Sequence, residues 1–173
     1  AVIALGIAGA TLASVMIVAG LFLTAASAAM RADHPHAGQN LKDAKWSPAP
    51  PLLPKGAEIA VLEGDPTKPG LYAVRLKFPE HYAIPAHSHP TDEHVVVTSG
   101  ALVFGMGDVL DKRSKTNTKL SVGGFVDASA NVNHFAFTRD EETTIVLYGE
   151  GPVEFNYVNP NEDPRNHPNV GRQ

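Results

Sequence analysis

Short runs of apolar and β-branched residues, separated by turn residues, constrain the fold of this chain more than any other feature. The runs lie at 58–62, 71–78, 93–98, 101–106, 119–122, 125–127, 134–138, 143–148 and 153–158. Turn residues such as Ser99-Gly100, Gly107-Asp108 and Gly123-Gly124 lie between them, which is typical of antiparallel strands. No run shows the period of about 3.6 residues that an amphipathic helix requires. The pattern predicts an all-β domain, built as an antiparallel sandwich or a jelly-roll barrel.

The composition narrows the class of protein. The chain has 173 residues, 43% hydrophobic and 18% charged, which is enough for one domain with a sizeable core. Its net charge of -4 and its lack of a basic cluster argue against nucleic-acid binding, because phosphate binding requires a positive surface. The sequence contains no cysteine, so disulfide bonds and thiol catalysis are excluded.

Two histidines and a glutamate have the spacing of metal ligands. On an extended segment, period-2 alternation points His87 and His89 to one face, and the turn residues Pro90–Asp92 let Glu93 begin the next strand beside them. Two imidazoles and a carboxylate then converge, and a fourth ligand from a distant strand completes a site for a divalent metal. His134 is the candidate, because it begins another β-rich run with apolar neighbours on its own face.

These residues resemble the two sequence motifs of the cupin superfamily. The first motif, His-x-His, three residues, Glu, six residues and Gly, is present here and ends at Gly100, and a later histidine matches the second motif. The ligand positions of the two motifs are filled by His87, His89, Glu93 and His134. The resemblance covers about residues 57–158, and the part from Gly64 to Asp108 is similar to small bacterial cupins of unassigned activity. It implies a single antiparallel jelly-roll barrel that holds a metal.

The motifs differ from the usual cupin pattern at the turns. His81 replaces the glycine that usually opens the first motif, and Ser129, Asn131 and Thr138 replace the proline, glycine and asparagine of the second. All four ligand positions are kept, so one divalent transition metal is expected. Mixed nitrogen and oxygen ligands suit Fe, Mn, Ni, Cu, Co and Zn alike, so the identity of the metal stays open.

The first 30 residues contain no charged side chain, and we predict that they form a transmembrane helix. About 20 apolar residues suffice to cross a bilayer, and the small residues Gly6, Ala10 and Ser14 would form a stripe for packing against other transmembrane subunits. The alternative is a cleaved secretion signal, supported by the small-x-small sequence Ala26-Ser27-Ala28. Both readings favour a domain on the periplasmic or extracellular side of a membrane.

Three further regions complete the predicted organisation. Residues 31–55 are rich in proline and are predicted to form an extended linker, in which His34 and His36 are solvated. Residues 56–158 form the cupin domain, where His94 falls on the face opposite Glu93 and is expected at the surface or between the sheets. Residues 159–173 form a polar tail that is mobile unless a partner surface orders it.

Two functions are compatible with this organisation. We favour a membrane-anchored accessory or structural subunit that docks on a larger complex, for example a photosynthetic or respiratory one. The alternative is a periplasmic metal-dependent enzyme, an oxygenase, lyase or isomerase, that acts on a small molecule in the barrel mouth. A fold does not specify its chemistry, so neither function follows from the cupin resemblance alone.

Overall fold

The computed structural model describes residues 38, 40–168 and 170. Residues from Gln39 onward belong to one compact unit. The predicted transmembrane segment, with Gly6, Ala10 and Ser14, lies outside the described residues. Within the described part of the chain, no helix is long and apolar enough to cross a membrane.

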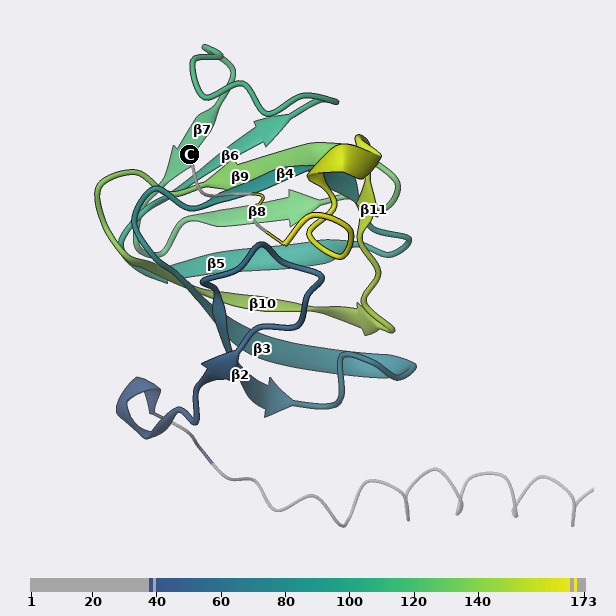
Figure 1. Cartoon of the computed structure of the whole chain (residues 1–173). Coiled ribbons are helices and arrows are strands. Elements are labelled where there is room, and N and C mark those ends of the chain that lie inside the picture. Colours follow the sequence, from purple (N-terminus) through teal and green to yellow (C-terminus); the bar gives the residue numbers. More distant parts are fainter. Residues whose placement is uncertain (1–37, 39, 169, 171–173) are drawn as a thin grey trace, which may run out of the picture. The chain divides into compact units, whose positions relative to one another are not determined.

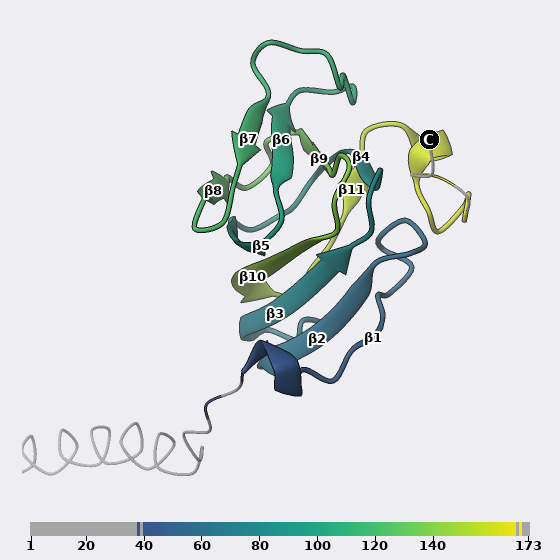
Figure 2. The same cartoon turned by 90° about the vertical axis from the view of Figure 1, so that its left-hand side faces the viewer.

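Two antiparallel sheets form the body of the unit (Figures 1 and 2). The six-stranded sheet has the order β1 (Ser47–Pro48), β2 (Glu58–Glu63), β3 (Gly70–Phe78), β10 (Thr143–Gly151), β5 (Glu93–Ser99) and β8 (Phe125–Ala128). The five-stranded sheet has the order β11 (Asn156–Tyr157), β4 (Ala83–Ser88), β9 (His134–Phe137), β6 (Leu102–Met106) and β7 (Thr118–Leu120). Two short 3-10 helices, η1 (Leu41–Asp43) and η2 (Pro160–Glu162), lie near the ends.

From β3 onward, the described chain crosses between the sheets at every connection except that between β6 and β7. Strands β3, β5, β8 and β10 belong to the first sheet, whereas β4, β6, β9 and β11 belong to the second. Antiparallel strands that alternate between two facing sheets are the arrangement of a jelly roll. The prediction of an all-β antiparallel architecture is therefore confirmed.

The core lies between the two sheets, as the alternation of residues along β3 illustrates. Tyr72, Val74, Leu76 and Phe78 are buried, and the residues between them are less so. Strands β5 and β10 add further buried aliphatic residues from the same sheet, and Phe104 and Ala136 contribute from the facing sheet. Burial of alternate side chains on both inner faces stabilises the sandwich and fixes which residues face inward.

Strand β4 was not among the runs expected from the sequence, because Pro85 interrupts it. A proline cannot donate to the strand ladder and usually occurs at edges or bulges. Here the pairing of β4 with β9 is irregular between Ile84 and His87, so the proline is accommodated. The extended conformation that we assumed for His87 is nevertheless present, because the register resumes with His87 opposite His134.

The two turns that depart from the cupin pattern both adopt the backbone conformation that glycine usually provides. His81 has a φ of 56° and Asn131 a φ of 61°. Asparagine tolerates this left-handed region better than most residues. The backbone N–H of Asn131 donates to the carbonyl of His89 over 2.8 Å, which ties the turn before His134 to the chain beside the predicted site.

Strand β9 is buried on both faces. Phe135 and Phe137 point away from the core and pack with Ala83 and Val103, and Leu110 of the loop between β6 and β7 packs against them. This group of residues 83, 103, 135 and 137 is called the outer-face cluster below. That loop covers an apolar surface, since Lys112 Nζ also lies 5.9 Å from the centroid of the Phe137 ring.

The end of the predicted linker packs on the barrel. Residues 46–54, called the proline-rich segment below, begin with Trp46, whose ring centroid lies 4.4 Å from Lys77 Nζ. Leu53 is only 7% exposed, and the hydroxyl of Tyr157 donates to the carbonyl of Leu52 over 2.7 Å. These contacts hold the segment along the barrel in an extended form, so it does not run free as a linker would.

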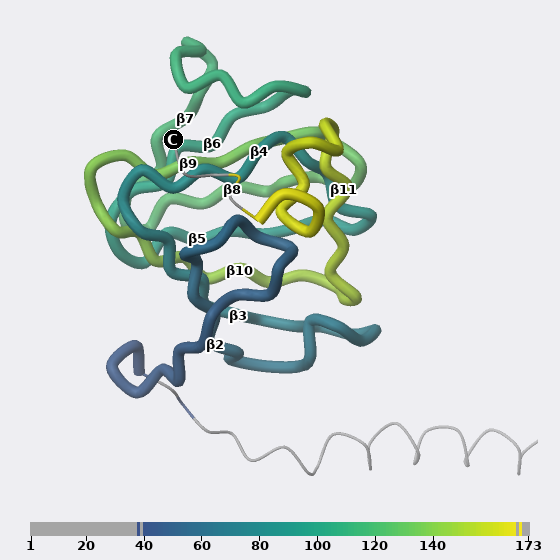
Figure 3. Tube along the Cα trace, viewed as in Figure 1, coloured from purple at the N-terminus to yellow at the C-terminus, as the bar shows by residue number. Residues whose placement is uncertain are grey.

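The first part of the predicted polar tail is also placed by its own domain. Asp163 is buried, and Arg165 donates to its carboxylate over 2.7 Å and to the carbonyl of Phe155 over 3.0 Å. An ion pair of this kind satisfies groups that would be costly to bury alone. The tail up to residue 168 therefore differs from our expectation of a segment that only a partner would order, and Figure 3 shows it beside the proline-rich segment.

Replacing Leu53 with alanine tests whether the proline-rich segment is part of the folded unit. We expect Leu53→Ala to lower the free energy of unfolding by about 2–4 kcal/mol, because it removes a buried side chain and leaves a cavity. Urea unfolding of the metal-free full chain measures the change. Leu41→Ala, at an exposed leucine, is the matched control and should change stability by less than about 0.5 kcal/mol. Equal effects of the two substitutions would contradict the packing.

Candidate metal centre

Strand pairing brings three of the predicted ligands together inside the barrel. His87 lies near the end of β4, His89 follows that strand, and His134 begins β9. Because His87 and His134 are register partners, their side chains leave neighbouring strands on the same face. All three histidines are buried, as is Glu93, the first residue of β5.

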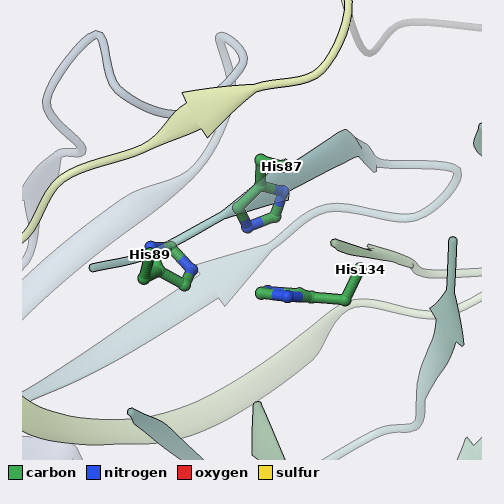
Figure 4. A group of neighbouring side chains, drawn as sticks. All are labelled: His87, His89 and His134. Atoms are coloured by element: carbon green, nitrogen blue, oxygen red, sulfur yellow. The ribbon is translucent and has the colours of Figure 1, made fainter. Parts of the chain in front are cut away.

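The three imidazole rings face one another (Figure 4). One ring nitrogen of each residue lies within 4.8 Å of those of the other two. The ring centroid of His87 is 4.9 Å from that of His89 and 4.4 Å from that of His134. We refer to His87, His89 and His134 as the histidine cluster.

A backbone carbonyl orients each ring of the histidine cluster. The Nδ1 atoms of His87, His89 and His134 lie 2.7, 2.7 and 3.0 Å from the carbonyl oxygens of Pro85, Glu154 and Val132, respectively. A carbonyl only accepts hydrogen bonds, so each Nδ1 carries a hydrogen, and in the neutral form of each ring Nε2 carries the lone pair. The Nε2 atoms of His89 and His134 are buried without a hydrogen-bond partner. This is the donor arrangement that a metal ion requires.

Glu93 lies at the edge of the histidine cluster. Its Oε1 is 3.4 Å from Nε2 of His89, but its carboxylate is not part of the group whose ligand atoms all lie within 4.8 Å of one another. The carboxylate thus places a negative charge beside the cluster.

Burial and charge set the protonation of the four residues. Burial, helped by the neighbouring His134 and His89, holds the pKa of His87 well below its usual value, and burial also lowers the pKa of His134. For His89, burial acts to lower the pKa, but the Glu93 carboxylate outweighs it and raises the pKa. Burial likewise acts to raise the pKa of Glu93, and His89 overcomes it, so this pKa is lowered. Burial thus favours the neutral form of His87 and His134, whereas His89 and Glu93 each favour the charged form of the other.

Aromatic and aliphatic side chains separate the cluster from water. The rings of Phe155 and Phe104 lie 4.6 and 5.2 Å from those of His87 and His134, respectively. A cavity of about 30 Å³, called the central cavity, is lined by His87, Glu93 and His134 together with apolar core residues. Charged groups act more strongly on one another in such a dry site than in water.

The other histidines that the structure describes fall outside the cluster. His94 lies on the other face of β5, against Tyr148 and Phe125, with its Nδ1 3.5 Å from Asp127 Oδ1. This placement agrees with its predicted position away from the ligands. His34 and His36 lie outside the described residues.

Sequence reasoning missed Phe155 and the three carbonyls that orient the rings, since backbone acceptors carry no signal in the amino-acid pattern.

Two facing antiparallel sheets that direct a histidine cluster into their interior define a cupin-fold protein. Three solved structures similar to the chain support this assignment. The polyketide cyclase RemF from Streptomyces resistomycificus matches with a TM-score of 0.61 and 14% identity, over 75% of this chain and 90% of RemF. An RmlC-like cupin protein from Ralstonia eutropha matches with a TM-score of 0.52 and 16% identity, over 68% and 69% of the two chains.

KdgF from Halomonas sp. matches with a TM-score of 0.50 and 17% identity, over 66% of this chain and 94% of KdgF. At these identities the likeness establishes the fold alone. Residues 12–156 match the family described as "Domain of unknown function (DUF4437)", and the chain belongs to that family. No curated protein matches the sequence.

A substitution at His134 tests whether the cluster is organised for a ligand at the expense of stability. In metal-free protein, we expect His134→Phe to leave the free energy of unfolding unchanged or to raise it by up to about 1 kcal/mol. It removes a buried nitrogen without a partner and keeps an aromatic ring beside Phe104, which offsets the lost hydrogen bond from Nδ1 to the Val132 carbonyl. Chemical denaturation measures the change. His167→Phe, at an exposed site, should have no effect. A loss of stability at His134→Phe greater than that of the control would contradict the expectation.

Proposed function

We propose that the protein binds one divalent transition metal through Nε2 of His87, His89 and His134. The observation that carries the proposal is the orientation of the three rings, in which every Nδ1 faces a backbone carbonyl and every Nε2 is left as an electron-pair donor. The three histidines suit a metal ion, because one ring nitrogen of each lies within 4.8 Å of the others and burial favours the neutral, metal-binding form of His87 and His134.

Glu93 is proposed as the oxygen ligand of the same metal. Its carboxylate is buried and lies 3.4 Å from Nε2 of His89, so a small side-chain rotation brings an oxygen to a cation held by the histidines. A negative ligand also offsets part of the charge of a divalent ion in a buried site. Three nitrogens and one oxygen suit Fe, Mn, Ni, Cu, Co or Zn.

We further propose that the protein is a metal-dependent enzyme that acts on a small molecule inside the barrel. When bound, a metal of this kind supplies Lewis-acid or oxygen-activating chemistry. The chain itself excludes water through Phe104 and Phe155 and keeps the Tyr72 hydroxyl protonated, since burial and the nearby Glu93 raise its pKa. Glu93 and Tyr72 are then the polar groups that face a bound molecule.

Metal analysis of the purified full chain tests the site. We expect about one equivalent of a transition metal per chain after mild purification, and none in the double variant His87→Ala plus His134→Ala, because removing two nitrogen ligands leaves too few donors. Elemental analysis by mass spectrometry gives the stoichiometry. His94→Ala, on the other face of β5, is the matched control and should keep the metal.

Removing the metal with a chelator should lower the melting temperature of the unaltered protein, since the ion binds only the folded state.

In the metal analysis, unchanged metal content in the double variant would remove the histidine cluster from the proposal. Loss of metal from the His94→Ala control would indicate that the metal binds elsewhere.

A second proposed function is that of a membrane-anchored accessory subunit with its barrel on the periplasmic or extracellular side. The observation that favours it is the run of 30 residues without a charged side chain, which can satisfy its backbone groups in lipid only as a helix. The small residues Gly6, Ala10 and Ser14 support close packing against a helix of another subunit.

Extraction of native membranes tests the anchor. We expect the full chain to resist washing at high pH and to be released by detergent, whereas a chain lacking residues 1–30 should stay in the wash. Gly6→Leu with Ala10→Leu should keep the protein in the membrane but release it from its complex, because bulky residues prevent close helix approach. Immunoblots of wash, detergent extract and native gels give the readout. Full-length chain in the wash would exclude the anchor.

A further inference from the structure

A second, larger cavity lies beside the central one. It has a volume of about 110 Å³ and is called the side pocket. Its lining residues come from the proline-rich segment, the six-stranded sheet and the chain after β10, and they include Pro50, Leu53, Tyr72, Val74, Val153 and Phe155. Leu53, Glu93 and Phe155 line both cavities, so the side pocket reaches the carboxylate next to the histidine cluster.

The side pocket has almost no charge to offer a ligand. None of the described residues that line it is lysine, arginine or histidine, and Glu93 is its single acidic residue. The Glu93 carboxylate already faces His89 at 3.4 Å. Thr67 and Tyr72 provide the hydroxyl groups, and the other lining side chains are apolar. A charged molecule would lose its hydration here and find no free counter-charge, which is costly.

The volume of the side pocket sets an upper size for its ligand. An apolar cavity of about 150 Å³ in another protein binds benzene, so a pocket of about 110 Å³ that adjoins a smaller cavity accommodates one ring. Two fused rings would displace wall residues, which resist movement because protein interiors are close-packed.

The proline-rich segment forms one wall of the side pocket. Tyr157 holds it by donating to the carbonyl of Leu52 over 2.7 Å, and Tyr82 donates to the carbonyl of Pro54. These two bonds fix the backbone on both sides of Leu53, whose buried side chain borders both cavities. Leu53 therefore limits the length of any molecule that extends from the side pocket towards Glu93.

We propose that the side pocket binds an uncharged, mainly apolar molecule of single-ring size carrying one hydroxyl-type group, and that Leu53 determines the size limit. This inference rests on the proposed metal-dependent function, because it names the substrate class of that site. The apolar walls take the ring, and the hydroxyl group of the molecule lies near Tyr72 and Glu93, the buried polar residues of the lining.

Calorimetry with three probes of equal ring size tests the charge preference. The metal-free full chain is titrated at neutral pH with benzyl alcohol, benzoate and benzylamine. We expect the dissociation constant of benzyl alcohol to be lower than those of both charged probes by about tenfold or more, because burial of an unpaired charge is penalised. Equal or tighter binding of benzoate or benzylamine would overturn the proposal, as would no binding of benzyl alcohol.

A second titration tests the size limit. 2-Naphthalenemethanol should bind the unaltered protein about tenfold or more weakly than benzyl alcohol, and Leu53→Ala should remove most of that difference by enlarging the pocket. Val74→Ala, which enlarges the same pocket from strand β3, provides a second variant if Leu53→Ala folds poorly. Val103→Ala, in the outer-face cluster, is the matched control and should leave the ratio unchanged.

The size limit is wrong if naphthalenemethanol binds the unaltered protein as tightly as benzyl alcohol does, or if neither enlarging variant changes the ratio. Metal content is measured separately on the same preparations. Selective binding of benzyl alcohol by a protein that never takes up metal would refute the metal-dependent function and leave the pocket assignment standing. A protein that binds metal but does not prefer benzyl alcohol would refute the pocket assignment and leave the metal-dependent function standing.

Discussion

The pairing of β4 with β9 is the constraint on which the site depends. It joins His87 to His134 across the sheet and gives both side chains the inward face. A shift by one residue would turn His134 outward and bring Phe135 inward. That shift is opposed on both sides of the sheet, because Phe135 and Phe137 are already buried in the outer-face cluster under Leu110. Double-sided burial of β9 thus fixes the register that assembles the histidine cluster.

Much of this arrangement could be predicted from local patterns, and the parts that could not depend on distant contacts. The runs gave most strands of both sheets, although β4 was missed. Motif spacing gave four residues that do lie near one another, and their role as ligands stays a prediction. The packing of Leu53 was missed because the prolines around it indicate extended chain equally well in solvent or on a surface. The φ of His81, and the carbonyls of Pro85 and Glu154, follow only from tertiary structure.

The electrostatics of the cluster explain why a fold would keep such an arrangement. Two buried Nε2 atoms without partners cost stability in the absence of a ligand. The two atoms belong to His89 and His134, and ionisation cannot relieve that cost at His134, since burial lowers its pKa. The Glu93 carboxylate stabilises positive charge at this place and is itself held ionised by His89. A cation bound to the two unpaired nitrogens would satisfy all of these groups at once, whereas another hydrogen-bond donor would satisfy only one.

The enzyme and subunit proposals rest on different parts of the chain. The contacts that hold the proline-rich segment, from Trp46 to Lys77 and from Leu52 to Tyr157, lie entirely within the unit that follows residue 38. The shape of the side pocket therefore does not require an anchor, and an anchor does not require a metal. Each proposal can therefore fail without the other, because the wall that residues 46–54 give the side pocket is held by contacts inside the folded unit.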